Sequence, residues 1–295
     1  MATLRELKGR IGSVASSEKI TGAMKMISSA KMHKAEGLLR QLRPYRDQVE
    51  LIIANLLNSD ATFESPLMTP HATVSSVAVA VWGSDDGLCG AYNINIFKQL
   101  LVKLQELRQT LGPDVKITIL PVGSKIAKAA RKLQMPGVEC EPVTDVDSKS
   151  TDVRSFAWTL RDGFLSGKYD RVEVVYMSYK SVSRQRLEAL QLLPVTTGAI
   201  EGLGNRKGAD RPYIFEPSVE AIFAHVLPMY LLAVVQDIFT ENRASEQAAR
   251  VMAMQSANDN AKTLLEELQL EYNKLRQQSI TTELLDIIGG QSNKD

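Results

Sequence analysis

The two ends of the chain are long stretches with few helix-breaking residues, and this feature limits the possible folds most. No Pro occurs between Ala2 and Arg43, and no Gly occurs between Ala209 and Ile288. Apolar residues recur in both stretches at spacings of three and four, which is typical of one apolar face along a helix. We expect helices of about 55 and 70 residues, which would be about 80 and 105 Å long. Such helices are too long for the core of one small domain.

Each predicted helix carries an apolar seam with a polar interruption. In the N-terminal helix, the interruption consists of Glu18, Thr21, Lys25 and Ser28. In the C-terminal helix it is the run "RASEQAARVMAMQSANDNAK", and Gly289 and Gly290 are predicted to end that helix. The seam positions are Leu4, Leu7, Ile11, Val14, Met32, Ala35, Leu39, Leu42, Val49, Ile53 and Leu56, then Val219, Ile222, Val226, Met229, Leu265, Leu268, Tyr272 and Leu275.

The middle of the chain alternates short β-branched runs with helical patterns. We expect strands at 75–82, 114–122 and 170–179, helices at 93–111, 124–133 and 152–165, and an antiparallel strand in "LEALQLLPVT". This alternation predicts an α/β domain with a mainly parallel, doubly wound sheet. Because both long helices leave this domain, antiparallel pairing would bury both seams in one coiled coil.

The predicted organisation has six parts. They are an N-terminal coiled-coil helix (1–57), a linker (58–73), an α/β globular domain (74–200), a loop (201–216), a C-terminal coiled-coil helix (217–290) and a tail (291–295). The second helix is the longer one, so its end should extend alone past the first. That end would expose Leu284, Leu285, Ile287 and Ile288, a surface that a partner is expected to cover.

Composition excludes several classes of protein. The chain has 295 residues, 44% of them hydrophobic, and 35 Lys and Arg balance 34 Asp and Glu. This balance argues against disorder and gives no indication of nucleic-acid binding. No uninterrupted apolar run reaches the length of a membrane span, and the first residues do not resemble a signal peptide. We therefore expect the chain in a cytosol-like compartment.

The residues that could carry chemistry form no convincing catalytic group. The loop "WGSDDGLCGAYN" lies between a strand and a helix, but its glycines do not fit a dinucleotide or phosphate-binding motif, and "VGSKIAK" is a weaker candidate. We interpret both as turns. Asp85 and Asp86 are expected in a solvated turn, and the thiols Cys89 and Cys140 are expected to be buried. His33, His71 and His225 lack metal-ligand spacing. We expect no cofactor and no metal.

Three segments resemble one family, the γ subunit of F-type ATP synthases, in its bacterial form. They are "GRIGSVASSEKITGAMKMISSAKMHKAE", "GLCGAYNINIFK" and "SEQAARVMAMQSANDNAKTLLEELQLEYNKLRQQSITTELLDIIGG". They occur in the expected order at both ends of the chain and in the domain between. The absence of a closely spaced Cys pair before the last helix argues against the light-regulated chloroplast form.

The resemblance implies a non-catalytic rotor subunit of a proton-translocating complex. The helix pair would lie inside a ring of three α and three β subunits, and the globular domain would contact the ring of c subunits, beside the ε subunit. Membrane association would then be indirect, at the cytoplasmic face of the cell's inner membrane. We expect the c-ring contact near "IEGLGNRKGADRPY".

The resemblance also implies partner-contact residues. Arg276 and Gln277 match the polar residues, called the catch, that hydrogen-bond loop carboxylates of the β subunit in this family. Thr281 and Glu283 match positions tied to the coupling of rotation to catalysis. The middle of the shaft carries the remaining two matches, Met24 and Arg250. An alternative is that such residues only join the two helices. Two other functions also stay open at this point, a nucleotide-binding α/β enzyme and a coiled-coil adaptor.

Overall fold

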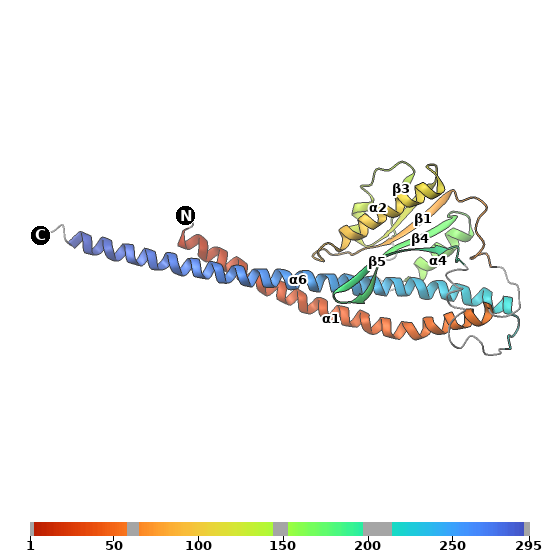
Figure 1. Cartoon of the computed structure of the whole chain (residues 1–295), viewed down its shortest axis with the longest axis horizontal. Coiled ribbons are helices and arrows are strands. Elements are labelled where there is room, and N and C mark those ends of the chain that lie inside the picture. Colours follow the sequence, from red (N-terminus) through yellow and green to blue (C-terminus); the bar gives the residue numbers. More distant parts are fainter. Residues whose placement is uncertain (1–2, 58–64, 144–152, 197–213, 292–295) are drawn as a thin grey trace. The chain divides into compact units, whose positions relative to one another are not determined.

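The computed structural model in Figure 1 describes residues 3–57, 65–143, 153–196 and 214–291. It consists of two compact units. One unit contains residues 1–28 and 250–295, and the other contains residues 29–249. Two long helices contribute to both units, and the larger unit also contains the sheet.

A five-stranded sheet with the order β3-β2-β1-β4-β5 organises the larger unit. Neighbouring strands are parallel except for β4 and β5, which are antiparallel. β1 is the central strand, and Val79 in it pairs with Ile119 of β2 and Glu173 of β4. The strands are β1 (Ser76–Trp82), β2 (Lys116–Val122), β3 (Val138–Cys140), β4 (Arg171–Ser181) and β5 (Arg184–Leu193).

Helices cover both faces of this sheet because the buried strands are apolar on both sides. Val77, Val79 and Val81 pack in one cluster with α2 (Tyr92–Leu111) and α3 (Ser124–Ala130). The intervening residues of β1 pack on α4 (Val153–Leu165) and on parts of the two long helices. The doubly wound α/β fold predicted from the sequence is therefore confirmed. Figure 1 shows α2 and α6 on opposite sides of the sheet.

The long helices are α1 (Leu4–Leu57) and α6 (Val219–Gln291), and they pair in antiparallel orientation. The predicted coiled coil is thus confirmed. Pro44 and Pro228 both lie inside these helices. Two details of the prediction are wrong.

The first is the expectation that Gly289 and Gly290 end the helix: α6 includes both and ends at Gln291, one residue past the predicted end at 290. Glycine costs a helix only about 1 kcal/mol relative to alanine, so it does not by itself end one. The second is the seam position Met229, which is 43% exposed. The buried face of α6 there is formed by Phe223, Leu227 and Leu231, because the helix packs on a sheet as well as on α1.

The N-terminal part of α6 is apolar because it belongs to the core. It contributes Phe223, Leu227, Leu231 and Val235 to the cluster that also contains Trp82. By length and composition alone, α6 is the one helix among the described residues that could cross a membrane. Its most apolar window of 18 residues has a mean hydropathy of 1.7, and 44% of that window is buried inside the protein. The packing on the sheet explains this apolar character without a bilayer.

The elements of the middle region follow the sequence pattern closely. The predicted strands at 75–82, 114–122 and 170–179 and the antiparallel strand are all present, although β5 begins earlier than expected. The short strand β3 was not predicted. The division into six parts stays a prediction, and the expected c-ring contact at 200–213 lies outside the described residues, as do 58–64 of the linker and the end of the tail.

Candidate partner-contact surfaces

In the smaller unit, polar contacts join the two helices midway along. Asn258 donates a hydrogen bond from Nδ2 to the backbone oxygen of Glu18 (2.7 Å), and Nδ2 also lies 3.4 Å from Thr21 Oγ1. Asn258 is 8% exposed, so this contact is shielded from water. Of the polar seam positions predicted from the sequence, Glu18 through its backbone and Thr21 through its side chain therefore face the partner helix. Directed hydrogen bonds replace part of the apolar burial that a regular coiled coil would have here.

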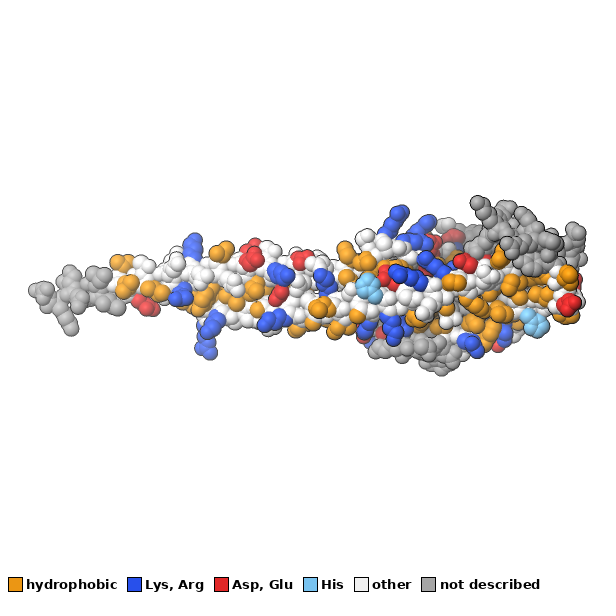
Figure 2. Space-filling model, turned by 90° about the horizontal axis from the view of Figure 1, so that it is seen from below, with side chains coloured by type: hydrophobic (Ala, Val, Ile, Leu, Met, Phe, Trp, Pro, Cys, Tyr) orange, Lys and Arg blue, Asp and Glu red, His pale blue; other side chains and the backbone are white. Residues whose placement is uncertain are grey.

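The outer surface of this unit has no single character. On the face shown in Figure 2, hydrophobic, basic and acidic side chains are interspersed along the helix pair. Several large apolar side chains are exposed here, among them Ile20, Met26, Ile27 and Leu270. A mixed surface of this kind can contact a surrounding protein without one dominant patch.

The two candidate residues in the middle of the shaft differ in accessibility. Met24 is half-buried, whereas Arg250 is buried, with 6% of its surface exposed. A buried guanidinium contributes more to contacts within the chain than to contacts with a partner. The placement of Arg250 therefore favours the alternative in which it joins the helices, and partner contact stays a prediction for both residues.

The end of α6 has no α1 residue beside it. Figure 1 shows α6 continuing past the first residues of α1. Arg276, Gln277, Thr281 and Glu283 all lie on this part of α6, and all four are exposed. The structure thus brings these predicted contact residues together on one accessible segment of two turns.

Most of these candidate contact residues keep their polar groups available for another chain. Thr281 donates from Oγ1 to the backbone oxygen of Gln277 (2.9 Å), which occupies its hydroxyl within the helix. The side chains of Arg276, Gln277 and Glu283 make no hydrogen bond or ion pair with the described residues. Their donors and acceptors therefore point to solvent and can bind carboxylates, amides or hydroxyls of another chain.

Apolar side chains accompany these polar ones at the end of α6. Ile280 is 45% exposed, Leu284 54% and Leu285 63%. The predicted exposed tip is confirmed for Leu284 and Leu285, while the side chains of residues 287 and 288 lie outside the described part. A segment that carries both polar and large apolar side chains is suited to bind a surrounding protein surface that is itself partly apolar.

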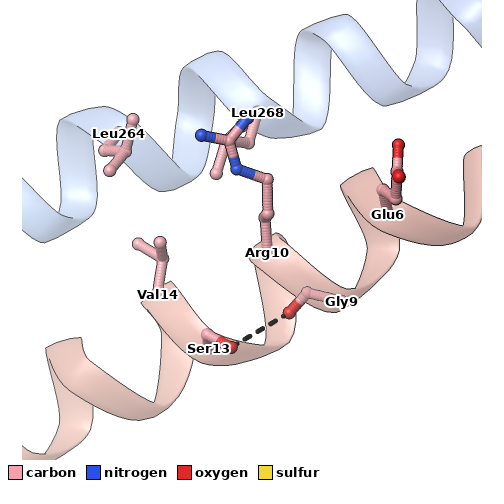
Figure 3. A pocket seen from close by; sticks show the side chains of 7 residues that line it. All are labelled: Glu6, Gly9, Arg10, Ser13, Val14, Leu264 and Leu268. Atoms are coloured by element: carbon pink, nitrogen blue, oxygen red, sulfur yellow. Dashed lines mark hydrogen bonds between the residues drawn. The ribbon is translucent and has the colours of Figure 1, made fainter. Parts of the chain in front are cut away.

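A hollow of about 700 Å³ separates the two helices near the start of α1 (Figure 3). Val14 of α1 faces Leu264 and Leu268 of α6 across it, and Arg10 extends from α1 toward α6. Gly9 adds no side chain to its wall. The helix pair is loosely packed here, because the contact depends on few apolar side chains.

In the larger unit, an ion network joins α1 to α6. Arg46 of α1 donates from Nε to Glu50 Oε1 (2.7 Å) and pairs with Asp237 of α6. Glu50 is 1% exposed and Asp237 is 7% exposed. Burial lowers the pKa of Arg46, but the two carboxylates outweigh burial and hold that pKa above its ordinary value. Arg46 itself is half-buried and compensates the charges of two buried carboxylates, so separating the helices would take this compensation from Asp237.

The loop after β1, which resembled a nucleotide-binding turn, satisfies its own polar groups. Ser84 is fully buried and donates from Oγ to the backbone oxygen of Asp86 (2.7 Å). The carboxylate of Asp85 accepts a hydrogen bond from the backbone N–H of Ser124 (2.9 Å), the first residue of α3. The Asp85 carboxylate thus occupies the N-terminus of α3, the helix that the weaker candidate "VGSKIAK" opens. This geometry supports the interpretation of the loop as a structural turn.

The three histidines take part in local packing. His71 pairs with Asp170 (2.8 Å) and stacks on Phe164, and His33 pairs with Glu36. His225 lies 2.7 Å from the backbone oxygen one turn earlier. Within the described residues, no group of three or more His, Cys, Asp or Glu is placed to hold a metal. Of the two thiols, Cys89 is buried and Cys140 is partly buried.

Comparison with known proteins decides the family. The family described as ATP synthase matches residues 3–293. The ATP synthase gamma chain of Bacteroides fragilis is 42% identical over 294 residues, which cover 98% of this chain and 99% of the relative. The gamma chain of Chlorobaculum tepidum is 36% identical, with 98% of each chain covered. The chain belongs to the ATP synthase gamma chain family.

Solved structures agree in fold. A chain of the Euglena gracilis mitochondrial ATP synthase, from a structure of OSCP, F1 and c-ring, aligns with a TM-score of 0.65 and 21% identity. The alignment covers 98% of this chain and 94% of that one. A rotor structure of the same organism gives a TM-score of 0.60. The sequence resemblance to the gamma chain family is therefore confirmed, together with the fold.

Two polar residues of this gamma chain family member were missed by sequence reasoning. Asn258 was counted only as part of a polar run, although it carries the hydrogen bond between the helices. Asn242 was not singled out, although it is 2% exposed and contacts three other elements. The sequence offered little signal, because polar residues flank both amides: Glu241 and Arg243 beside Asn242, and Asp259 beside Asn258. Deciding which face Asn242 occupies needed the sheet.

Proposed function

We propose that this chain is the central rotor subunit of a proton-translocating F-type ATP synthase and has no active site of its own. Family membership supports this role, and the relatives that carry the name gamma chain match it over nearly their full length. The observation in the structure that supports it most is the end of α6. That segment exposes both polar and large apolar side chains with no second helix beside it.

The asymmetry of the helix pair supports a coupling mechanism. A single rod that differs on its sides must contact three equivalent β subunits differently at any instant. Differential contact energy is what shifts a protein between two conformations. Rotation of the rod would therefore change the state of each catalytic site in turn, while nucleotides and Mg²⁺ bind to the neighbours.

The residues that we propose as the β-subunit catch are Arg276 and Gln277. A charge-assisted hydrogen bond from Arg276 to a carboxylate would contribute about 1.5–3 kcal/mol when partly buried. Contacts of that size can hold the helix pair at one rotational angle and can still be broken in each step of the rotation. We propose Thr281 and Glu283 as coupling contacts and Met24 and Arg250 as residues of the middle shaft.

The partners we propose follow from the same role. The α/β domain would contact the c-ring and the ε subunit, while three α and three β subunits would surround the helices. The Euglena assembly that the chain resembles in fold contains F1 and a c-ring. The chain would accordingly be a peripheral protein at the cytoplasmic face of the inner membrane, held there through the c-ring.

Reconstitution tests this proposal. The purified chain is mixed with α and β subunits, and the stoichiometry of the complex is measured by native mass spectrometry. We expect one copy per three α and three β subunits, and three copies per complex would refute the rotor role. The chain alone should hydrolyse no ATP, whereas the complex should. Hydrolysis by the isolated chain would contradict the non-catalytic part of the proposal.

A further inference from the structure

We propose that Asn242 is the positioning residue that fixes the rotational setting of α6 against the α/β domain. This inference rests on the proposed rotor function, because a shaft can transmit torque only if it does not turn within its own base. Asn242 lies on α6 in the larger unit and is 2% exposed.

The Asn242 side chain binds three different elements. Its Oδ1 atom accepts a hydrogen bond from the Tyr92 hydroxyl (2.7 Å) and another from the backbone N–H of Met177 (3.3 Å). Its Nδ2 atom donates to the backbone oxygen of Gly83 (3.3 Å). These groups belong to α2, β4 and the loop after β1, so one amide connects α6 to three parts of the domain.

The elements that receive these hydrogen bonds are themselves held in place. Gly83 donates its backbone N–H to Val122 at the end of β2 (2.8 Å), and a Cβ atom at Gly83 would lie 2.6 Å from Ile126. Tyr92 is 3% exposed at the start of α2. Met177 lies within β4 and is 6% exposed. A force on α6 would therefore be resisted by the sheet and α2 rather than by a mobile loop.

The other contacts of α6 near Asn242 reach fewer parts of the domain. Glu241 hydrogen-bonds Ser178 and the backbone of Tyr179, which belong to β4 alone, and Asp237 pairs with Arg46 of α1. One turn further along, Ala244 and Ala248 pack against Tyr179 and against the α1 residues Met32 and Ala35. Methyl groups offer little shape to resist a small rotation of the helix, because the hydrophobic effect has no direction. Hydrogen bonds, in contrast, weaken steeply with misalignment. A buried amide is also the best-attested device by which helices fix their register.

Spin-label distances in the assembled complex test the rotational setting. The spin labels are attached to cysteines introduced at residue 102 of α2 and residue 229 of α6. The native side chains at these positions are 55% and 43% exposed. Cys140 is replaced by Ser so that it is not labelled. The other subunits should carry no accessible cysteine. We expect a single narrow distance distribution in the otherwise native chain. Asn242→Leu and Tyr92→Phe should broaden or shift it.

A matched control separates this role from a general loss of a buried polar group. Thr240 is also on α6 and is 6% exposed, but its hydroxyl donates within the helix, to the backbone oxygen of Gln236 (2.8 Å). Thr240→Val should leave the distances unchanged. If Asn242→Leu does not assemble, Tyr92→Phe removes one oxygen only, which contacts both Oδ1 (2.7 Å) and the backbone oxygen (3.0 Å) of Asn242, and still tests the inference. Unchanged distances in both variants would overturn it.

Coupling provides a readout that a merely structural role would not change. In membrane vesicles, proton pumping and ATP hydrolysis are measured on the same preparation. We expect Asn242→Leu to lower the number of protons pumped per ATP several-fold while hydrolysis continues, since α6 beyond its core residues Phe223–Ile238 would be held less rigidly to the domain. An unchanged ratio in Asn242→Leu would overturn the inference. A wild-type complex that contains three copies of the chain, or none, would instead refute the proposed function.

Discussion

The buried ion pair between Lys103 and Glu173 allows a quantitative prediction about the larger unit. Glu173 lies on β4 and is fully buried, and its Oε1 atom accepts a hydrogen bond from Arg171 Nε (2.6 Å). Its Oε2 atom lies 3.3 Å from Lys103 Nζ of α2. That contact lacks hydrogen-bond geometry, so it is mainly electrostatic. Removing the charge of Lys103 would therefore leave one carboxylate oxygen buried without compensation.

The expected cost can be derived from these contacts. Breaking a buried pair by removing one partner destabilises a protein by about 3–5 kcal/mol. Arg171 still compensates the other oxygen of Glu173, so we expect about 2–3 kcal/mol for Lys103→Met, close to the cost of one unsatisfied buried group. The double variant Lys103→Met with Glu173→Met should recover most of that loss, because it leaves no buried carboxylate behind.

The assay is urea unfolding of the full chain, followed by circular dichroism. Lys116→Met is the matched control, since Lys116 pairs with Glu139 (3.1 Å) at side-chain exposures of 57% and 65%. An exposed pair contributes about 0–1 kcal/mol. The reasoning is refuted if Lys103→Met shifts the unfolding midpoint no more than Lys116→Met, or if the double variant is less stable than Lys103→Met.

Three further predictions concern pH, coupling and the helix pair. Burial raises the pKa of Asp170, but hydrogen bonds from His71 and from backbone N–H groups outweigh it and hold the pKa below its ordinary value. The hydrogen bonds to the Asp170 carboxylate therefore stabilise the folded chain fully at pH values above the pKa of an Asp in the unfolded chain, about 3.9. This stabilisation is lost as the pH falls below that value. Acid titration of Asp170→Asn should accordingly show a weaker pH dependence below pH 4, and an unchanged dependence would contradict this. Arg276→Ala with Gln277→Ala should lower coupled ATP synthesis without changing helicity, whereas an equal loss of circular dichroism would make the pair structural. Asn258→Ala should lower the free energy of unfolding by about 1 kcal/mol, measured by urea unfolding, since one interhelical hydrogen bond is lost.

The sequence predicts the elements of this chain well where the pattern is long and periodic. The two terminal helices are read from spacing, because burial of one face imposes a period of about 3.6 on a helix. The parallel strands are read as short β-branched runs, because both of their faces are buried. The exposed end of α6 also follows from sequence, since the second helix is simply longer than the first. β3, with three residues, is too short to produce such a pattern.

Tertiary structure decides which polar residues are enclosed and what they bind. Asn242 and Asn258 are polar positions whose sequence neighbours give no hint of their partners, which lie 65 to 240 residues away along the chain. Arg250 shows the same limit, since its motif predicts a contact surface whereas the folded chain buries it. Periodicity records which face of an element avoids water. The direction and partner of a hydrogen bond depend on elements that only folding brings together.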